Sequence, residues 1–119
     1  MVERFGERAM IHYFGAATDS GGTLHDERGE KVHLLEVFAP ETTKWTAISA
    51  LAEKRGIPAE RIAAIGDEAN DLAMIRGAGL GIAMGNAALA VKQAARQETG
   101  TNLEDGVALA IERILSGKW

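Results

Sequence analysis

A short, wholly apolar run that passes at once into an acidic turn is the feature that most constrains the fold of this chain. Residues 62–65 are only Ile and Ala, and Gly66 then leads into the segment 67–71. A second apolar run, 80–84, follows a short helical stretch. Such runs are typical of parallel strands buried on both faces. The order strand-helix-strand-helix from residue 62 onward therefore predicts an α/β fold whose parallel sheet has right-handed crossovers.

The segment after residue 40 has apolar residues at helical spacing and clear end signals. Thr42 or Thr43 is expected as the N-cap, and Gly56 as the C-terminal stop. The remaining predicted elements are a helical turn from Pro58, helices over 72–75, 87–96 and 103–115, and a very short strand over 97–99.

The first 40 residues follow a different pattern. Segments 9–17 and 32–38 are apolar and partly β-branched or aromatic, and the polar, glycine-rich segment 18–29 separates them. This pattern predicts an antiparallel β-hairpin with a long loop. We therefore expect a β-strand segment over residues 1–40 and an α/β unit over 41–119.

Composition narrows the class of protein. The formal net charge is −4 and the pI is about 5.4, so a nucleic acid is not expected as the main partner. The absence of cysteine excludes disulfide and thiol chemistry. No apolar run approaches the length of a membrane helix, and the first residues do not resemble a signal peptide. We therefore expect a cytoplasmic protein with no membrane partner.

The segment 66–71 concentrates the groups that could carry chemistry. Asp67 and Asp71 are four residues apart, and Asn70 lies between them, just after a buried strand. Ligands of open α/β sheets bind outside the carboxyl ends of the strands. Hard oxygen ligands in an open arrangement suit Mg²⁺, which shares its coordination sphere with substrate phosphate. From spacing alone a second reading stays open, in which Asp67 only caps a helix and Asp71 sits in its first turn.

The same residues resemble a known family. Gly66 to Asp71 matches the Gly-Asp-x-x-Asn-Asp signature of the haloacid dehalogenase superfamily, and the resemblance covers about residues 32–115. P-type ATPases share a related element, but the downstream residues fit them less well. The further segments similar to the Cof-type phosphatase branch are 35–37 followed by Lys44, 71–75, 78–79, 81–87, 91–95 and 99–107.

The resemblance implies a Mg²⁺-dependent phosphatase of small phosphorylated metabolites with a partial Rossmann-like core. It implies that Asp67 binds Mg²⁺, that Asp71 completes or orients the metal site, and that Asn70 holds the phosphoryl group. Lys44 would neutralise charge on the nucleophile and on the transferring phosphoryl group. Without the family match, Lys44 would be interpreted as a solvated lysine in a first helical turn. Trp45 stands where the family usually has glycine, and its ring either alters access or fills core space.

The family's catalytic nucleophile has no match in this sequence. An Asp-x-Asp motif normally supplies a nucleophile and an acid/base, and the chain contains none. Segment 19–24 resembles that motif, but Gly21 replaces its second Asp, so we interpret it as a glycine-rich turn and keep Asp19 as a minor candidate nucleophile. We expect residues 1–40 to match the end of a cap domain, and the chain to be inactive alone. A truncated protein, the product of a split gene or a domain taken from a longer protein would each lack the Asp-x-Asp motif in this way.

The missing first strand has a consequence for assembly. The strand ending at Gly66 would lose a neighbour, and an unpaired apolar edge invites pairing with another chain. Either segment 9–17 fills this gap or the chain dimerises. We expect a homodimer whose N-terminal strands contribute to the interface, or a partner chain that supplies the other half of the core. The alternative is a non-catalytic module that binds metal or phosphate, or serves only in assembly.

Overall fold

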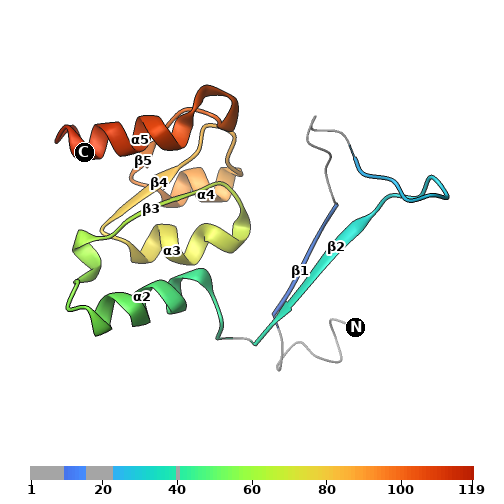
Figure 1. The fold of residues 1–119 in the computed structure, drawn as a ribbon, viewed down its shortest axis with the longest axis horizontal. Helices are drawn as coiled ribbons and strands as arrows, with labels where there is room; N and C mark the ends of the chain where they lie inside the picture. The colour runs from blue at the N-terminus through green and yellow to red at the C-terminus, as the bar shows by residue number, and fades with distance from the viewer. Residues whose placement is uncertain (1–9, 16–22, 40) are drawn as a thin grey trace. The chain divides into compact units, whose positions relative to one another are not determined.

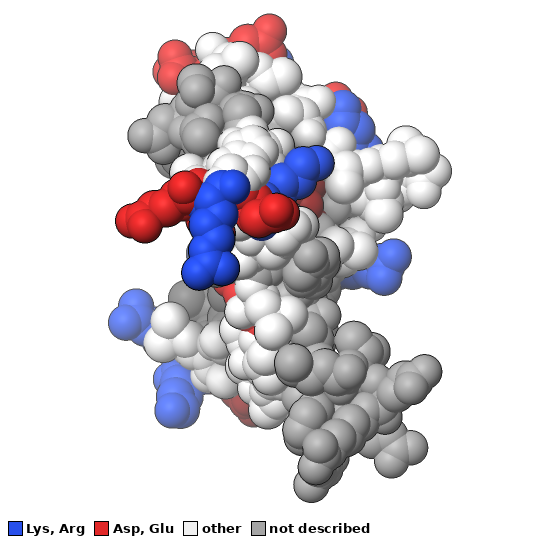
Figure 2. Space-filling model, turned by 90° about the vertical axis from the view of Figure 1, so that its right-hand side faces the viewer, with Lys and Arg blue, Asp and Glu red and all other residues white. Residues whose placement is uncertain are grey.

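The computed structural model describes residues 10–15, 23–39 and 41–119 (Figure 1). The chain divides into two compact units, Met1–Thr42 and Thr43–Trp119. On the face shown in Figure 2, acidic and basic side chains of the described residues are intermixed. Within the described ranges, no helix has the length and apolar character needed to span a bilayer.

The first unit contains an antiparallel pair of strands, as predicted. Strand β1 (Met10–Gly15) pairs with β2 (His33–Phe38), with Met10 opposite Phe38 and Gly15 opposite His33. Part of the predicted loop is a tight turn in which Oδ1 of Asp26 accepts hydrogen bonds from the backbone N–H groups of Arg28 (2.8 Å) and Glu30 (2.9 Å). Segment 16–22 of that loop lies outside the described residues.

The second unit contains the predicted parallel sheet. Its strands are β3 (Ala63–Gly66), β4 (Leu80–Ala83) and β5 (Gln97–Glu98), in the order β3-β4-β5. Both pairings are parallel, so all three carboxyl ends lie at one edge. The helices of the unit are α2 (Lys44–Lys54), α3 (Leu72–Gly77), α4 (Leu89–Ala94) and α5 (Gly106–Leu115), with short helical turns η1 (Ala59–Arg61), η2 (Ala69–Asp71) and η3 (Asn102–Glu104).

Helix α2 begins and ends where the local signals place it. Thr43 is the N-cap: its hydroxyl accepts from the backbone N–H of Thr46, and the hydroxyl of Thr46 accepts from the N–H of Thr43. This reciprocal pair satisfies two backbone donors that a helix start leaves without partners. After the helix, Gly56 has a φ of +65°, the left-handed conformation that glycine adopts without strain.

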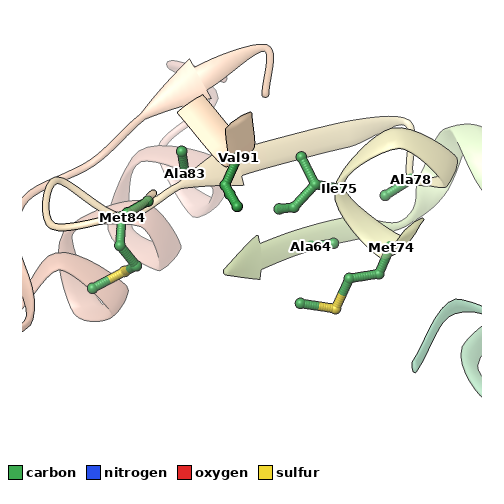
Figure 3. Packing of buried hydrophobic residues seen from close by; sticks show 8 residues of the cluster. Ala64, Met74, Ile75, Ala78, Ala83, Met84 and Val91 are labelled. Atoms are coloured by element: carbon green, nitrogen blue, oxygen red, sulfur yellow. The ribbon is translucent and has the colours of Figure 1, made fainter. Parts of the chain in front are cut away.

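Small and branched side chains from the sheet and its helices form the core (Figure 3). Ile75 of α3, Ala83 of β4 and Val91 of α4 are almost completely buried and belong to one cluster. Glycine is required at position 81, because a Cβ there would lie 2.1 Å from the backbone oxygen of Ile75. Helix α3 and the sheet are therefore packed backbone against backbone, which keeps the turn between β3 and α3 close to the sheet edge.

Two predicted helices are longer than the observed ones. The helix predicted over 87–96 is α4, Leu89–Ala94, because the N–H of Ala88 donates to the carbonyl of Asp67 and the N–H of Arg96 donates to the carbonyl of Gly81. Both ends are thus drawn into contacts with the sheet and its loops. The helix predicted over 103–115 begins only at Gly106, since Asp105 adopts a left-handed conformation with φ 53° and separates η3 from α5.

Candidate functional site

The turn between β3 and α3 places several polar groups at the carboxyl edge of the sheet. Gly66 ends β3, and the chain then passes through Asp67 and Glu68 into η2. A Cβ on Gly66 would lie 2.5 Å from Cβ of Asp71. Because position 66 is glycine, there is room for the Asp71 side chain to fold back over the end of β3.

The carboxylate of Asp71 is the centre of this turn. The residue is only 4% exposed. Its Oδ2 accepts hydrogen bonds from the backbone N–H groups of Asp67 (3.0 Å) and Glu68 (3.2 Å), and its Oδ1 accepts from Nζ of Lys44 (2.6 Å). Burial acts to raise the pKa of Asp71, but the Lys44 hydrogen bond and the two backbone hydrogen bonds outweigh it and hold the pKa below its usual value of 3.8. Asp71 is therefore a fixed anion at neutral pH.

Lys44 reaches this carboxylate from the first turn of α2. Its side chain is 51% exposed, yet its ammonium is held by a buried charge 27 residues along the chain. The structure thus brings Lys44 and Asp71 together. It does not leave Lys44 as a lysine that only faces solvent, which was the interpretation favoured without the family match. Its role in catalysis stays a prediction.

The Asp67 side chain has a different environment from that of Asp71. It is partly exposed, and its Oδ2 accepts a hydrogen bond from Nδ2 of Asn86 (3.2 Å). Its main-chain carbonyl accepts from the N–H of Ala88 (2.9 Å), so the loop after β4 holds it at two points. Sequence reasoning missed Asn86. The signal was present in the segment 81–87, which was recognised as similar to the family but was given no role.

Asn70 completes the set. Its Oδ1 is buried and accepts no hydrogen bond within the part of the chain that the structure describes. A buried amide oxygen without a donor is costly in a folded protein and marks a position where a further group is expected. The predicted site residues Asp67, Asn70 and Asp71 therefore lie on one turn, with Lys44 bonded to the last of them. Asp19, the minor candidate nucleophile, lies outside the described residues.

The described residues offer few ligands for a metal ion. Over 23–39 and 41–119, no group of three or more His, Asp or Glu side chains is close enough to form a complete cage. Both oxygens of Asp71 already accept hydrogen bonds, whereas the partly exposed Asp67 receives one, to Oδ2. A hard cation that keeps several waters and binds substrate phosphate fits such a site. Asp67 would hold Mg²⁺ there, and Asp71 would orient Lys44 and the turn.

This geometry agrees with a comparison with known families. Residues 22–111 match the family of haloacid dehalogenase-like hydrolases, which is well over half of the chain. The chain belongs to this family. The turn at 66–71 is thus its Gly-Asp-x-x-Asn-Asp motif, and the motif's first and last carboxylates differ sharply in burial and in hydrogen bonding.

Two phosphatases of Bacillus subtilis are among the curated proteins that are similar to this chain. The 5-amino-6-(5-phospho-D-ribitylamino)uracil phosphatase YcsE is 51% identical over 77 residues, which cover 65% of this chain and 31% of YcsE. The phosphatase YitU, named for the same substrate, is 44% identical over 84 residues, covering 71% of this chain and 31% of YitU.

A solved structure gives a similar result. A haloacid dehalogenase-like hydrolase from Bacteroides thetaiotaomicron aligns with a TM-score of 0.65 and 44% identity, covering 81% of this chain and 35% of that one. The chain therefore spans about one third of the length of the relatives it matches.

Trp45 is a departure from the family motif that the structure explains. The ring packs against the core, and a Cβ on Gly77 would lie 2.2 Å from its Cε2 atom. Of the two sequence-based readings, the ring fills core space, in the volume that a side chain at position 77 would occupy. The bulky neighbour of Lys44 is therefore accommodated by a glycine at the end of α3.

Proposed function

We propose that this chain supplies the metal- and phosphate-binding part of a Mg²⁺-dependent phosphatase. The observation that carries the proposal is the buried Asp71 carboxylate, which ties Lys44 to the turn that presents Asp67. Membership of the haloacid dehalogenase-like hydrolase family supports the same proposal.

The arrangement suits phosphoryl transfer because that reaction needs mainly positioning and charge stabilisation. Asp71 holds the Lys44 ammonium at a fixed point by a 2.6 Å hydrogen bond, so its positive charge is preorganised. Asn70 precedes Asp71 in the same turn, and its buried Oδ1 has no donor within the described part of the chain. A Mg²⁺ ion on Asp67, when bound, would add positive charge against the phosphate oxygens.

The nucleophile must come from outside the described residues. Hydrolysis through a covalent intermediate requires a carboxylate oxygen that attacks phosphorus and a general acid that protonates the departing alcohol. A water molecule must then cleave the resulting acyl phosphate, which releases phosphate and restores the carboxylate. Residues 41–119 contain no Asp-x-Asp motif. We therefore propose that another segment supplies this carboxylate, in the same polypeptide or in a partner chain, with Asp19 as the minor candidate.

The substrate class follows from the relatives. YcsE and YitU are named for a substrate with a phosphorylated ribityl chain. We propose that the complete enzyme acts on small phosphate monoesters of sugars or sugar-like polyols. Lys44, Asn70 and a Mg²⁺ ion held by Asp67 would contact the phosphoryl end, which such substrates share, and they would not select among them.

A chimera tests the function without requiring a nucleophile in this chain. Residues 43–119 would replace the matching segment of YcsE, and hydrolysis of p-nitrophenyl phosphate would be measured with and without Mg²⁺. We expect Mg²⁺-dependent turnover that falls at least about 100-fold in Asp67→Asn and in Lys44→Ala. Gln93→Ala, an exposed residue of α4, is the matched control and should leave turnover unchanged. The isolated chain should show little or no turnover.

A folded chimera without activity would contradict the proposal. So would an Asp67→Asn variant as active as its parent, since the cation would then have another ligand. Mg²⁺-dependent turnover by the isolated chain would contradict the proposal that the nucleophile comes from another polypeptide. In that case the loss of this activity in Asp19→Asn would place the nucleophile in the segment 19–24.

Assembly is a second candidate role, favoured by the exposed apolar surface of the second unit. Among the described strands, β3 pairs only with β4, so its other edge is not covered by a described strand. Along α5, Val107 and Ile111 are about half exposed, and Leu115 is 82% exposed. Surface of this kind is typical of an interface. We propose a homodimer or a complementing chain, and sedimentation of a monomer across the micromolar range would contradict the homodimer.

A further inference from the structure

The side chain of Asn86 connects two segments that are far apart in the sequence. Its Nδ2 donates to Oδ2 of Asp67 (3.2 Å), and its Oδ1 accepts from the backbone N–H of Asn102 (2.9 Å). Asp67 follows β3, Asn86 follows β4, and Asn102 lies four residues after β5. One amide therefore joins the loops beyond all three strands of the sheet.

The orientation of this amide is set by its partners. A backbone N–H can only donate, so the atom that faces Asn102 must be the oxygen, Oδ1. The nitrogen, Nδ2, then necessarily faces Asp67. The usual ambiguity between the two ends of an asparagine amide does not arise here. The donor that reaches the Asp67 carboxylate is thus determined by a contact with a different loop.

The loop that carries Asn86 is held on both sides. The N–H of Met84 donates to the carbonyl of Gly66 (2.9 Å), and the N–H of Gly85 donates to the carbonyl of Gly100 (3.0 Å). After Asn86, the N–H of Ala88 donates to the carbonyl of Asp67 (2.9 Å). Asn86 is therefore delivered to Asp67 by a backbone frame that leaves little freedom to the loop.

We propose that Asn86 is a positioning residue for the metal site. It holds Oδ2 of Asp67, and so fixes the carboxylate in the orientation that presents Oδ1 to a divalent cation. This inference rests on the proposed function, because it takes Asp67 as the ligand of Mg²⁺. Groups that orient a metal ligand in this way commonly change metal affinity by about 10-fold to 100-fold when they are removed.

A titration of the full chain with MgCl₂, followed by NMR of the ¹⁵N-labelled protein, tests the inference. The backbone amides of Asp67 and Glu68 and the side-chain NH₂ of Asn86 should shift along one binding curve. Asn86→Ala should raise the apparent Kd for Mg²⁺ about 10-fold. Gln93→Ala, an exposed residue of α4, is the matched control and should leave the Kd unchanged.

The outcomes separate this inference from the proposed function. If the Asp67 and Glu68 amides of the unaltered chain do not respond to Mg²⁺, both are wrong. If those amides respond while the Asn86 NH₂ resonance stays in place, only the inference is wrong. An unchanged Kd in a folded Asn86→Ala variant would also overturn only the inference, because Asn86 would then serve merely to anchor the η3 segment. The NH₂ measurement needs no substitution, so it remains decisive even if Asn86→Ala fails to fold.

Discussion

The two units of this chain use the same kind of turn in different surroundings. In the first unit, Asp26 accepts hydrogen bonds from two backbone N–H groups and is exposed. In the second, Asp71 also accepts from two backbone N–H groups, but it is buried and it additionally holds Lys44. An aspartate-stabilised turn is therefore not a functional signal in itself. Burial and a charged partner from a different helix distinguish the second turn.

The burial of apolar side chains differs in the same way. Over residues 23–39, every side chain whose burial is described is exposed or half-exposed, whereas the second unit has a continuous core. A two-stranded pair without a buried core is marginally stable by itself. The contrast indicates that the second unit holds most of the folding free energy, and that the rigid support of the candidate site comes from it.

Removing core volume should give the largest difference between the units. Ile82 of β4 is completely buried, and Ile82→Ala should lower the free energy of unfolding by about 3 kcal/mol through lost burial and a residual cavity. Val37 of β2 is 58% exposed, and Val37→Ala should change it by less than about 0.5 kcal/mol. Urea unfolding followed residue by residue with amide hydrogen exchange measures both. Equal effects would mean that the first unit has a core of its own.

Removing the two turn aspartates is the matched test of the site. Asp71→Ala removes the buried acceptor of two part-buried backbone N–H groups and of the Lys44 ammonium, and should cost about 2 kcal/mol. In Asp26→Ala, the freed N–H groups can bond to water, so the cost should stay below about 1 kcal/mol. Chemical denaturation followed residue by residue with amide hydrogen exchange reports on both units and measures the two costs. A cost for Asp71→Ala no greater than that for Asp26→Ala would contradict the role given to burial.

Substitutions at the boundary between the units should have a smaller effect on the free energy of unfolding. Thr42 ends the first unit, and Thr43 begins the second as the N-cap of α2. Thr43→Ala should destabilise the second unit by about 1 kcal/mol, because the capping hydroxyl is lost. Thr42→Ala should have almost no effect on the same unfolding transition. If the two variants were equally destabilised, the reciprocal bonds of Thr43 and Thr46 would not be what starts the helix.

The smallest expected effect concerns acid sensitivity. The described carboxyl groups with a lowered pKa, Asp71 and Glu104, both lie in the second unit. For Asp71 the folded-state pKa lies below the unfolded value, so its stabilisation is fully present above the unfolded pKa and is lost as pH falls through the folded pKa. Lys44→Met should raise the Asp71 pKa and move this loss to higher pH. The ¹³C shift of the Asp71 carboxyl against pH measures it, and an unchanged midpoint would show that Lys44 contributes nothing.

The sequence predicted the elements that depend on local signals. The apolar run 62–65, the glycine at position 66 and the acidic segment 67–71 were sufficient for a buried parallel strand and its turn, and both are present. The hairpin strands and the start of α2 were predicted from alternation and capping in the same way. The choice between Thr42 and Thr43 was left open, because either hydroxyl could cap until the position of Thr46 was fixed.

The features that were missed depend on contacts between loops. The early end of α4 results from the N–H of Arg96 donating to the carbonyl of Gly81 in β4, the middle strand, and no local signal near residue 96 indicates it. The left-handed Asp105 follows from a capping box between Thr101 and Glu104 that closes η3. Asn86 reaches Asp67 across 19 residues, so its partner is set by the order of the strands. The capping box of Thr101 and Glu104 is a local pattern that could have been read, whereas the partners of Arg96 and Asn86 depend on the order of the strands.

Paramagnetic broadening by Mn²⁺, which substitutes for Mg²⁺ at oxygen ligands, tests the central claim most directly. The amide resonances of the full ¹⁵N-labelled chain would be followed while MnCl₂ is added at substoichiometric amounts. We predict that Asp67, Glu68 and Asn70 broaden first and that excess Mg²⁺ restores them. Broadening that begins at other acidic residues, while the turn at 66–71 stays sharp, would show that this carboxylate turn is not the metal site.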